Sequence, residues 1–479
     1  MKRILTLSAA LLLVGCSQIP DPPAPQASDA DPQMQQTQAP PEEDITLHMA
    51  VLGSLPDAVQ HELDAYNAED NHCHIETVDY MQYISPDDMD ENGTLSGREA
   101  LSPAALHLQM DILSGEAMEI VPDSAFAENL GHFEVLLQKG AFCDLYPFMA
   151  QDDEVNTDTL DAHVLALHET DGELRCLPLL YTVGTLLGDP AYVGETENWT
   201  FAQMQSAWEA APEGLTFNHA NATKDYVYYT VLRDELGGFV DYETVSCRFD
   251  SPEFVQMLQF CNSFPETPPE KTDVWDAHDF VFERTVRGFQ DFHTECAGST
   301  LVGYPSEDGQ GAFLSSAYYR MAVCRNAAAP AQEAAWQYLR RLALEPCQKA
   351  MQCEGYDEYG NLVEGGYDAP SFYNEIGFPV NRAAYTQAAA LLTERAAQGV
   401  PNAQSMQGTE YDEGWFSQEE CDHLNAYIAH IDRLDTSLDY SLVGIVQEEI
   451  FRMFDGVQTP EECARAVQSR AQIMVSEQS

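Results

Sequence analysis

The stretch from Ile45 to Val78 most constrains the fold, because it reads as a strand, a helix and a second strand joined by short turns. Ile45–Leu52 places apolar side chains at alternate positions, which is the spacing of a half-buried strand. Gly53-Ser54-Leu55-Pro56 forms a turn, and its proline is placed for the first turn of a helix. His72–Val78 reads as the second strand. This succession predicts a parallel α/β layer.

The chain is too long for one core. Its 479 residues exceed the roughly 250–300 at which a single core stops growing, so two domains or lobes are expected. A hydrophobic content of 44% is enough to fill them. Capped helix starts recur later in the chain, at Thr200–Gln203, Ser251-Pro252 and Thr459–Glu462. Ala334–Leu342 carries apolar side chains at helical spacing, so helices and strands alternate throughout.

The first 44 residues read as an export signal and a tether. Lys2-Arg3 precede the apolar run Ile4–Val14, which is shorter than the roughly 20 residues that span a bilayer. Gly15-Cys16 then resembles a lipoprotein cleavage site, so we expect residues 1–15 to be removed and Cys16 to carry a lipid such as palmitate. In the alternative, the signal is an ordinary one and this cysteine is incidental. Residues 16–44 are proline-rich and predict an extended tether.

Charge and cysteine content exclude several classes of protein. Seventy-nine acidic against 22 basic residues give a net charge of −57, which would repel nucleic acid and anionic lipid headgroups and attract cations. A soluble, strongly hydrated surface is the simplest reading of this acidity. The lipid would then be the only membrane attachment. Twelve cysteines form no C-x-x-C pair, and Cys347 and Cys353 are close enough in sequence to bridge.

One local motif matches a calcium loop. Residues 88–99 satisfy D-x-[DN]-x-[DN]-G-x₅-E at every required position. The ligand oxygens would come from Asp88, Asp90, Asn92, Thr94, Ser96 and Glu99. No helix is predicted before this loop, so the site is either a structural Ca²⁺ site or a solvated acidic turn. No cofactor is otherwise required.

Motifs for catalysis are missing from the sequence. It contains no G-x-S-x-G elbow, no H-E-x-x-H and no phosphate-binding glycine loop. His72 and His74 are close together, but on a strand they read as surface or core residues. We therefore expect a protein that is not an enzyme.

Several segments, in order along the chain, resemble the extracellular solute-binding proteins of ABC importers that are related to maltose-binding protein. The similar segments are Leu106–Val121, Lys139–Leu145, Leu177–Gly184, Trp199-Thr200, Val302–Pro305 with Asp308-Gly309, Ala334–Leu339, Gly377–Asn381 and Ile445–Glu477. Met118-Glu119 departs from the family, which usually has Pro-Asp there, and the calcium-like loop is an insertion.

The resemblance implies a type II periplasmic-binding-protein fold, in which two discontinuous α/β lobes are joined by a hinge. Lobe 1 would comprise residues 45–180 and 305–372, with the insertion at 88–99. Lobe 2 would comprise residues 181–304 and 373–479. The first crossing between lobes would lie at Leu177–Gly184 and the return crossing at Val302–Pro305.

The function that the resemblance implies is solute capture at the outer face of the cell membrane. A lipid-anchored monomer would close over a small solute, most simply a carbohydrate or oligosaccharide, and deliver it to an ABC permease. Nucleic acid is not an expected partner. Ligand contacts are expected from loops at the strand ends and from aromatic side chains, namely Gly53, Ser54, Asp123, Ser124, Tyr181, Thr182, Trp275, Tyr304, Trp415 and Phe416.

Three alternatives stay open at the level of sequence. The acidity favours a cationic solute such as a polyamine or a basic peptide, which would require a cleft lined by carboxylates, whereas two or more aromatic residues with mixed polar groups would favour a sugar. A surface-anchored hydrolase would show turnover that depends on one carboxylate. A calcium-dependent adhesion lipoprotein would bind a polymer or a cell surface without affinity for small solutes.

Overall fold

A computed structural model describes residues 44–69, 72–85, 101–115, 118–212, 214–218, 223–241, 244–267, 279–351, 353–356, 362–363, 372–406, 409–412, 414–435 and 440–478. These residues belong to one compact unit, Asp44–Ser479. Cys16, which is predicted to carry the lipid, residues 16–43 of the predicted tether, the calcium-like loop 88–99 and Trp275 lie outside the described residues. Within the described part of the chain, no helix combines the length and apolarity needed to cross a bilayer.

The first sheet contains the predicted parallel pair. Its strand order is β2-β1-β3-β11-β4, formed by β1 (Ile45–Val51), β2 (Cys73–Asp79), β3 (Ile120–Pro122), β4 (Leu177–Pro178) and β11 (Arg320–Val323). Strand β1 runs parallel to β2 and β3, while β11 is antiparallel to β3 and β4. The prediction of a strand, a helix and a parallel strand is confirmed.

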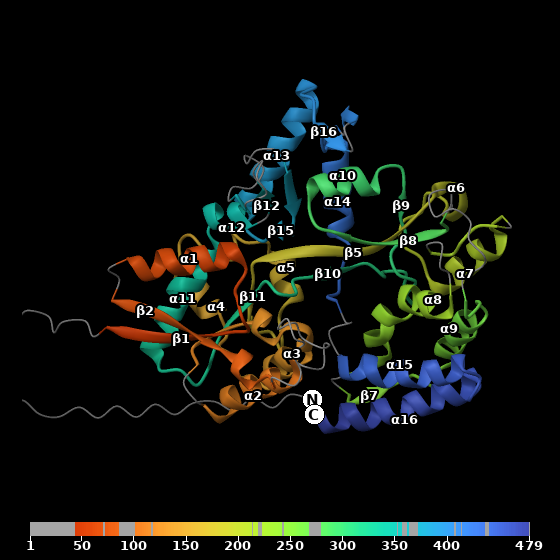
Figure 1. Ribbon diagram of the computed structural model, residues 1–479, viewed down its shortest axis with the longest axis horizontal. Helices are drawn as coiled ribbons and strands as arrows, with labels where there is room; N and C mark the ends of the chain where they lie inside the picture. The colour runs from red at the N-terminus through yellow and green to blue at the C-terminus, as the bar shows by residue number, and fades with distance from the viewer. Residues whose placement is uncertain are drawn as a thin grey trace, which may run out of the picture. The chain divides into compact units, whose positions relative to one another are not determined.

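Helices cover both faces of this sheet. Successive side chains of a strand point to opposite faces, so the apolar side chains of β1 need a core on each side. Leu47, Met49 and Val51 point into a core shared with the helices on one face, and Ala50 points into the core on the other. The first face is covered by α1 (Asp57–Ala68) and α11 (Ala329–Ala343), and the second by α2 (Ser102–Ser114) and α3 (Gly131–Gln138). Figure 1 shows α1 and α11 beside β1.

The second sheet is built around one long strand, β5 (Leu180–Gly188). Four strands pair with it in antiparallel fashion, namely β8 (Val281–Val286), β9 (Thr300–Leu301), β10 (Phe313–Ser315) and β15 (Phe378–Pro379). In Figure 1, β5 runs from the elements around β11 towards those around α8.

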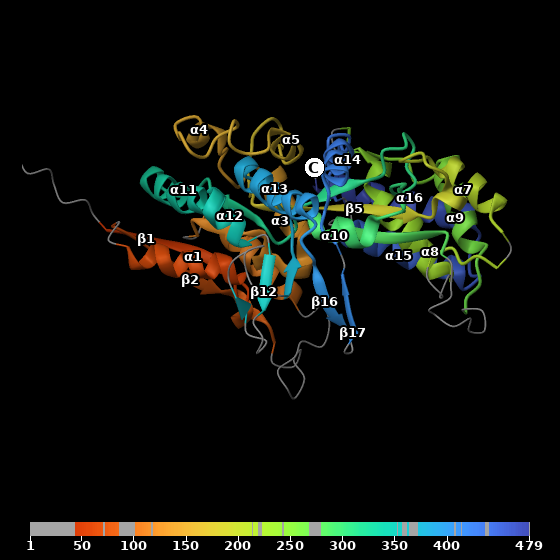
Figure 2. The same ribbon diagram turned by 90° about the horizontal axis from the view of Figure 1, so that it is seen from above.

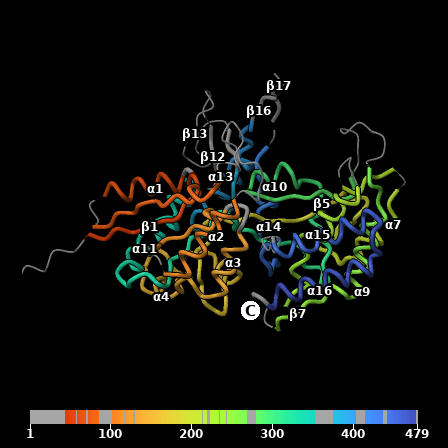
Figure 3. The backbone as a smooth tube through the Cα atoms, turned by 60° about the horizontal axis from the view of Figure 1, so that its bottom comes forward, coloured from red at the N-terminus to blue at the C-terminus, as the bar shows by residue number. Residues whose placement is uncertain are grey.

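A separate core of aromatic and aliphatic residues lies beyond β5. It is enclosed by α7 (Phe201–Ala210), α8 (Lys224–Val231), α9 (Pro252–Asn262), α15 (Tyr440–Phe454) and α16 (Pro460–Gln478). Figure 3 shows α15 and α16 side by side, with α9 next to α16. The capping boxes predicted at Thr200 and Thr459 both form: Thr459 Oγ1 accepts the Glu462 N–H at 3.2 Å and the Glu462 carboxylate accepts the Thr459 N–H at 2.9 Å.

The remaining helices continue the first core. They are α4 (Tyr146–Met149), α5 (Ala162–Leu167), α10 (Phe289–Cys296), α12 (Glu345–Met351), α13 (Arg382–Gln398) and α14 (Gln418–Ile428), while α6 (Pro190–Val193) precedes α7. Figure 2 shows α11, α12 and α13 in succession. Three small sheets combine β6 (Val240–Asp241) with β7 (Ser246–Cys247), β12 (Cys353–Tyr356) with β13 (Leu362–Val363) and β14 (Phe372–Glu375), and β16 (Ala403–Met406) with β17 (Thr409–Asp412).

Three connections lead into or out of the second sheet, and the first two of them link it to the first sheet. Leu179 joins β4 to β5, Ser316–Tyr319 joins β10 to β11, and Ile376-Gly377 leads from β14 into β15 beside β5. The first crossing therefore lies where the sequence predicts it. The return crossing lies at Ser316–Tyr319 and not at Val302–Pro305, because the Val302 N–H still donates to Leu186 O of the second sheet at 2.9 Å.

The described cysteines are packing residues. Ten of them are free thiols, and eight of these are buried. Burial raises the pKa of the Cys143 thiol to about 11, which keeps it protonated at neutral pH. The possible bridge between Cys347 and Cys353 does not form, since Cys347 is free.

Candidate functional site

A cavity of about 230 Å³ lies where the chain crosses between the two sheets. Its walls come from β5, β8 and β10 and from the second and third connections. The lining residues are Leu180, Tyr181, Thr182, Thr285, Arg287, Ser315, Ala317, Tyr318, Tyr319 and Ile376. The cavity thus combines three tyrosines, three hydroxyl side chains and one guanidinium, and no carboxylate belongs to this set.

Strand β5 positions two of the predicted ligand residues in this cavity. Tyr181 is buried and packs against Phe378 with 5.5 Å between ring centroids, while Thr182 is half-buried. Thr182 pairs with Ser315 across the sheet, and its Oγ1 donates to Ser315 O at 3.4 Å. Burial raises the pKa of Tyr181 well above its ordinary value, so its hydroxyl stays neutral and able to donate.

Asp123 supports the cavity from behind. Its carboxylate is fully buried and accepts the Tyr318 N–H at 3.0 Å and the Arg320 N–H at 3.1 Å. Arg320 Nε also donates to it at 2.8 Å. Tyr318 has a φ of +71°, which a residue with a Cβ adopts at a cost, and these bonds hold the backbone there. Asp123, predicted to contact ligand, therefore fixes the turn that carries Tyr318 and Tyr319.

The ion pair behind this turn is itself buried. Arg320 is 3% exposed, donates to Glu134 Oε1 at 2.6 Å and lies 4.9 Å from the Phe133 ring centroid. Burial acts against its charge, but the carboxylates of Glu134 and Asp123 together raise the pKa of Arg320. The guanidinium is thus a fixed charged anchor between β3 and β11.

The predicted residues after β1 and β3 lie at one edge of the first sheet. Gly53 and Ser54 are exposed, and the Gly53 N–H donates to Asp79 Oδ1 at 3.0 Å. Gly53 has a φ of +76°, which favours glycine at this turn. Ser124 is half-buried beside Asp123. Gly53, Ser54, Asp123 and Ser124 do not line the cavity.

Three predicted aromatic residues pack within the protein. Tyr304 is 2% exposed, stacks on Phe313 at 5.4 Å and donates its hydroxyl hydrogen to Glu283 Oε1 at 3.2 Å. Phe416 is fully buried, and Trp415 is half-buried with Arg395 4.8 Å from its ring centroid. These three do not line the cavity.

Five residues that supply polar or aromatic groups to the cavity were not predicted, namely Thr285, Arg287, Ser315, Tyr318 and Tyr319. The two tyrosines directly precede a strand that begins at Arg320, so the pattern of an aromatic pair before a short apolar strand was the available signal. Thr285 and Arg287 lie at the end of β8, where the sequence shows no comparable local signal.

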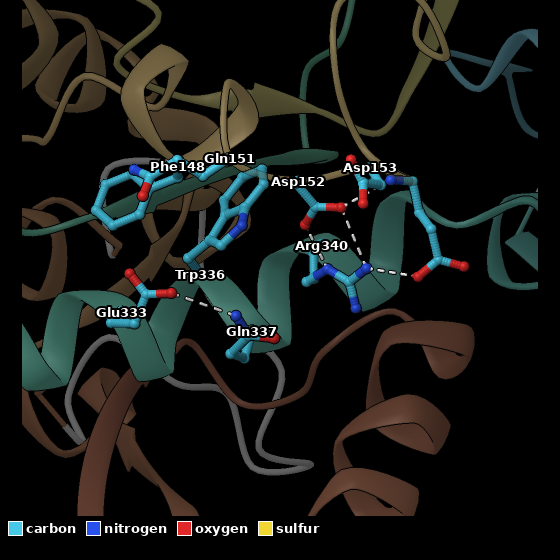
Figure 4. Close-up of a pocket in the computed structure, with 9 residues that line it drawn as sticks. Phe148, Gln151, Asp152, Asp153, Glu333, Trp336, Gln337 and Arg340 are labelled. Atoms are coloured by element: carbon cyan, nitrogen blue, oxygen red, sulfur yellow. Dashed lines mark hydrogen bonds and ion pairs between the residues drawn. The ribbon is translucent and has the colours of Figure 1, made fainter.

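Two other hollows lie at the surface beside α11, and Arg340 and Arg341 in them are already paired with carboxylates. One, of about 300 Å³, is shown in Figure 4, where Phe148 lies by Trp336 and Arg340 by Asp152. Arg340 donates to Asp152 at 2.5 Å and to Glu154 at 2.7 Å. The other, of about 500 Å³, contains Arg341, which is held by Glu62 and Glu69 in the same way. The cavity between the sheets is therefore the stronger candidate site.

Comparison with solved structures establishes the fold. A periplasmic oligogalacturonide binding protein from Yersinia enterocolitica is 13% identical with a TM-score of 0.52, covering 91% of this chain and 100% of its own. The sugar-binding protein MalE from Xanthomonas citri is 10% identical with a TM-score of 0.50, covering 90% and 98%. A designed esterase improved by directed evolution is 13% identical with a TM-score of 0.51, covering 91% and 99%.

No protein-family model matches the sequence, and no curated protein matches it. The chain is mixed α/β with the two-lobed fold of periplasmic binding proteins, as the sequence predicts. At identities this low the likeness carries the fold and nothing finer, so function rests on the cavity.

Proposed function

We propose that this protein is an extracellular solute-binding receptor that captures a carbohydrate and delivers it to an ABC permease. The observation that carries the proposal is the cavity at the crossings, which is lined by Tyr181, Tyr318 and Tyr319 and by three hydroxyl side chains. Sugar rings present C–H faces that pack on aromatic rings, and hydroxyls that exchange hydrogen bonds with polar side chains. A polyamine or basic peptide would require a cleft lined by carboxylates, and the described residues that line this cavity include none.

Hinge closure is the mechanism that this location supports. The cavity is built from the connections between the sheets, so a bound solute touches the segments whose backbone angles change when two lobes close. Contacts that form only in the closed state would favour closure and signal occupancy to a permease. Asp123 would keep Tyr318 in place throughout, because its bonds to the turn lie on the buried side.

The membrane arrangement is part of the proposal. Cys16 would carry the lipid and residues 16–44 would act as the tether, which raises the effective concentration of a monomeric receptor beside its permease. The strongly acidic composition would keep such an exported protein soluble. Two of the similar structures are described as binding sugars or oligogalacturonides, which is the ligand class proposed here from the cavity.

The test is calorimetry of the purified protein with panels of neutral and acidic oligosaccharides and with polyamines. We expect one saccharide class to bind, and Tyr318→Asn to weaken that binding about 5- to 30-fold because a ring contact is worth roughly 1–2 kcal/mol. Asparagine tolerates the positive φ at this position, so the turn is kept.

Tyr226→Asn is the matched control, since this tyrosine is also exposed but lies on α8. Binding should not change in the control. Absence of binding to every saccharide, or equal weakening in both variants, would contradict the proposed function.

A further inference from the structure

We infer that the solute carries a carboxylate, so that the ligand class is an acidic saccharide such as a uronate oligomer. This inference rests on the proposed function and narrows it. The residue that carries it is Arg287, the cation among the residues that line the cavity.

Arg287 adds a guanidinium to the residues that line the cavity. It directly follows β8 and its side chain is exposed. Its backbone N–H donates to Asp291 Oδ2 at 2.8 Å, and the other oxygen of Asp291 is paired with Arg284. Among the residues that the structure describes, the Arg287 guanidinium has no carboxylate partner.

The arginines at the two surface hollows and behind the cavity differ from Arg287 in this respect. Arg340 and Arg341, which line the two surface hollows, each bind two carboxylates. Arg320, behind the cavity, also binds two. With 79 acidic residues against 22 basic ones, a cation finds a partner easily. An arginine of the cavity wall that has no carboxylate partner among the described residues is placed for a negative group on the solute.

The buried carboxyl group of Glu375 does not supply that negative group. Glu375 precedes the lining residue Ile376, but its oxygens accept the N–H groups of Gln290 and Asp291 at the start of α10, at 3.0 and 2.5 Å. A Cβ on Gly288 would lie 2.3 Å from its carboxyl carbon, which shows how closely Glu375 packs against that helix start. Glu375 is thus directed at α10.

The chemistry of the cavity favours a carboxylated sugar over a simple anion. A guanidinium binds a carboxylate through two parallel N–H donors, while the tyrosines and the three hydroxyl side chains suit a sugar ring. The net charge of −57 repels anions at long range, but at physiological salt this field decays over about 8 Å. A direct contact at Arg287 survives such screening.

The experiment compares matched ligands in which the charged carboxylate is replaced by a neutral group. Uronate oligomers of two to four sugars, with galacturonate, glucuronate, mannuronate or guluronate units, are titrated beside their methyl esters and beside neutral oligosaccharides. We expect one uronate to bind at least 10-fold more tightly than its ester. Arg287→Gln should remove this preference, with a loss of about 10- to 100-fold for the acid and little change for the ester. Arg287→Lys should retain part of it.

Arg465→Gln is the control for net charge, because Arg465 is an exposed arginine on α16, away from the cavity residues. It should leave the preference intact. Equal binding of acid and ester, tighter binding of glucose 6-phosphate than of any uronate, or an equal loss in the control would overturn the inference while leaving the receptor function standing. No binding of any saccharide would overturn both.

Discussion

Replacing Asp123 by Asn tests the anchor behind the cavity. The carboxylate is fully buried and accepts three bonds, from the Tyr318 and Arg320 backbones and from Arg320 Nε. Asparagine keeps the shape but removes the charge, so Arg320, at 3% exposure, is left with Glu134 alone. Removing one partner of a buried ion pair lowers the free energy of unfolding by about 3–5 kcal/mol.

The assay is thermal and urea unfolding of Asp123→Asn followed by circular dichroism. If the lobe around the first sheet unfolds as one unit, a loss of 3–5 kcal/mol lowers its Tm by about 6–20 °C. The control is Asp171→Asn, since Asp171 pairs with Arg175 at 3.3 Å but its side chain is 77% exposed. That change should cost less than about 1 kcal/mol.

A double variant separates charge from shape. Asp123→Leu combined with Arg320→Met removes both ions, and replacement of a buried pair by apolar groups is often neutral. Recovery should nevertheless be partial, because the N–H groups of Tyr318 and Arg320 would lose their acceptor, at about 1–3 kcal/mol each. A loss below about 1 kcal/mol in Asp123→Asn would refute the reasoning, because it would mean that the buried pair contributes little.

Three further outcomes are expected. Burial raises the pKa of Glu375 to about 8, so between pH 4.5 and 8 the folded state binds a proton that the unfolded state has lost. The free energy of unfolding should therefore fall as the pH rises from about 4.5 through 8. Glu375→Gln should flatten that slope in unfolding measured at several pH values. Gly184→Ala should destabilise the protein by about 1–3 kcal/mol in urea unfolding, because the new Cβ would lie 2.3 Å from the Phe313 ring. The control is Gly444→Ala in α15, where a new Cβ would have no atom within 4 Å. It should be neutral or stabilise the protein by about 0.5–1 kcal/mol. If residues 88–99 bind calcium, chelation should lower the Tm and Glu99→Ala should abolish that shift; an unchanged melting curve would leave an acidic turn.

The first layer could be predicted from sequence because its signals are local. Successive side chains of Ile45–Val51 point alternately into the two cores on either side of the sheet, which produces the apolar alternation seen in the sequence. Helix α1 begins directly after Pro56. The capping boxes at Thr200 and Thr459 likewise depend on residues three positions apart. Such features are determined before any long-range contact forms.

The candidate site depended on contacts that are distant in sequence. Asp123 was singled out by its place after β3, but its role is fixed by Arg320, 197 residues later, and no local pattern reports that pairing. The return crossing was placed too early because Val302–Pro305 looks like the end of a strand, and only the pairing of β10 with β5 and of β11 with β3 locates it. Tyr318 and Tyr319 were missed for the same reason.

The position of β11 has a consequence for the order of assembly during synthesis. It lies between β3 and β4 in the first sheet, yet its residues, Arg320–Val323, come after the whole of β5, β8 and β10. At about 5–20 residues per second, the ribosome takes roughly 7–28 s to pass from β4 to β11. During that time β3 and β4 lack β11, the strand with which both of them pair. The exposed edge of β3 is then open to pairing with other chains. The nascent protein therefore has a long interval in which a chaperone, rather than its own sheet, must protect it.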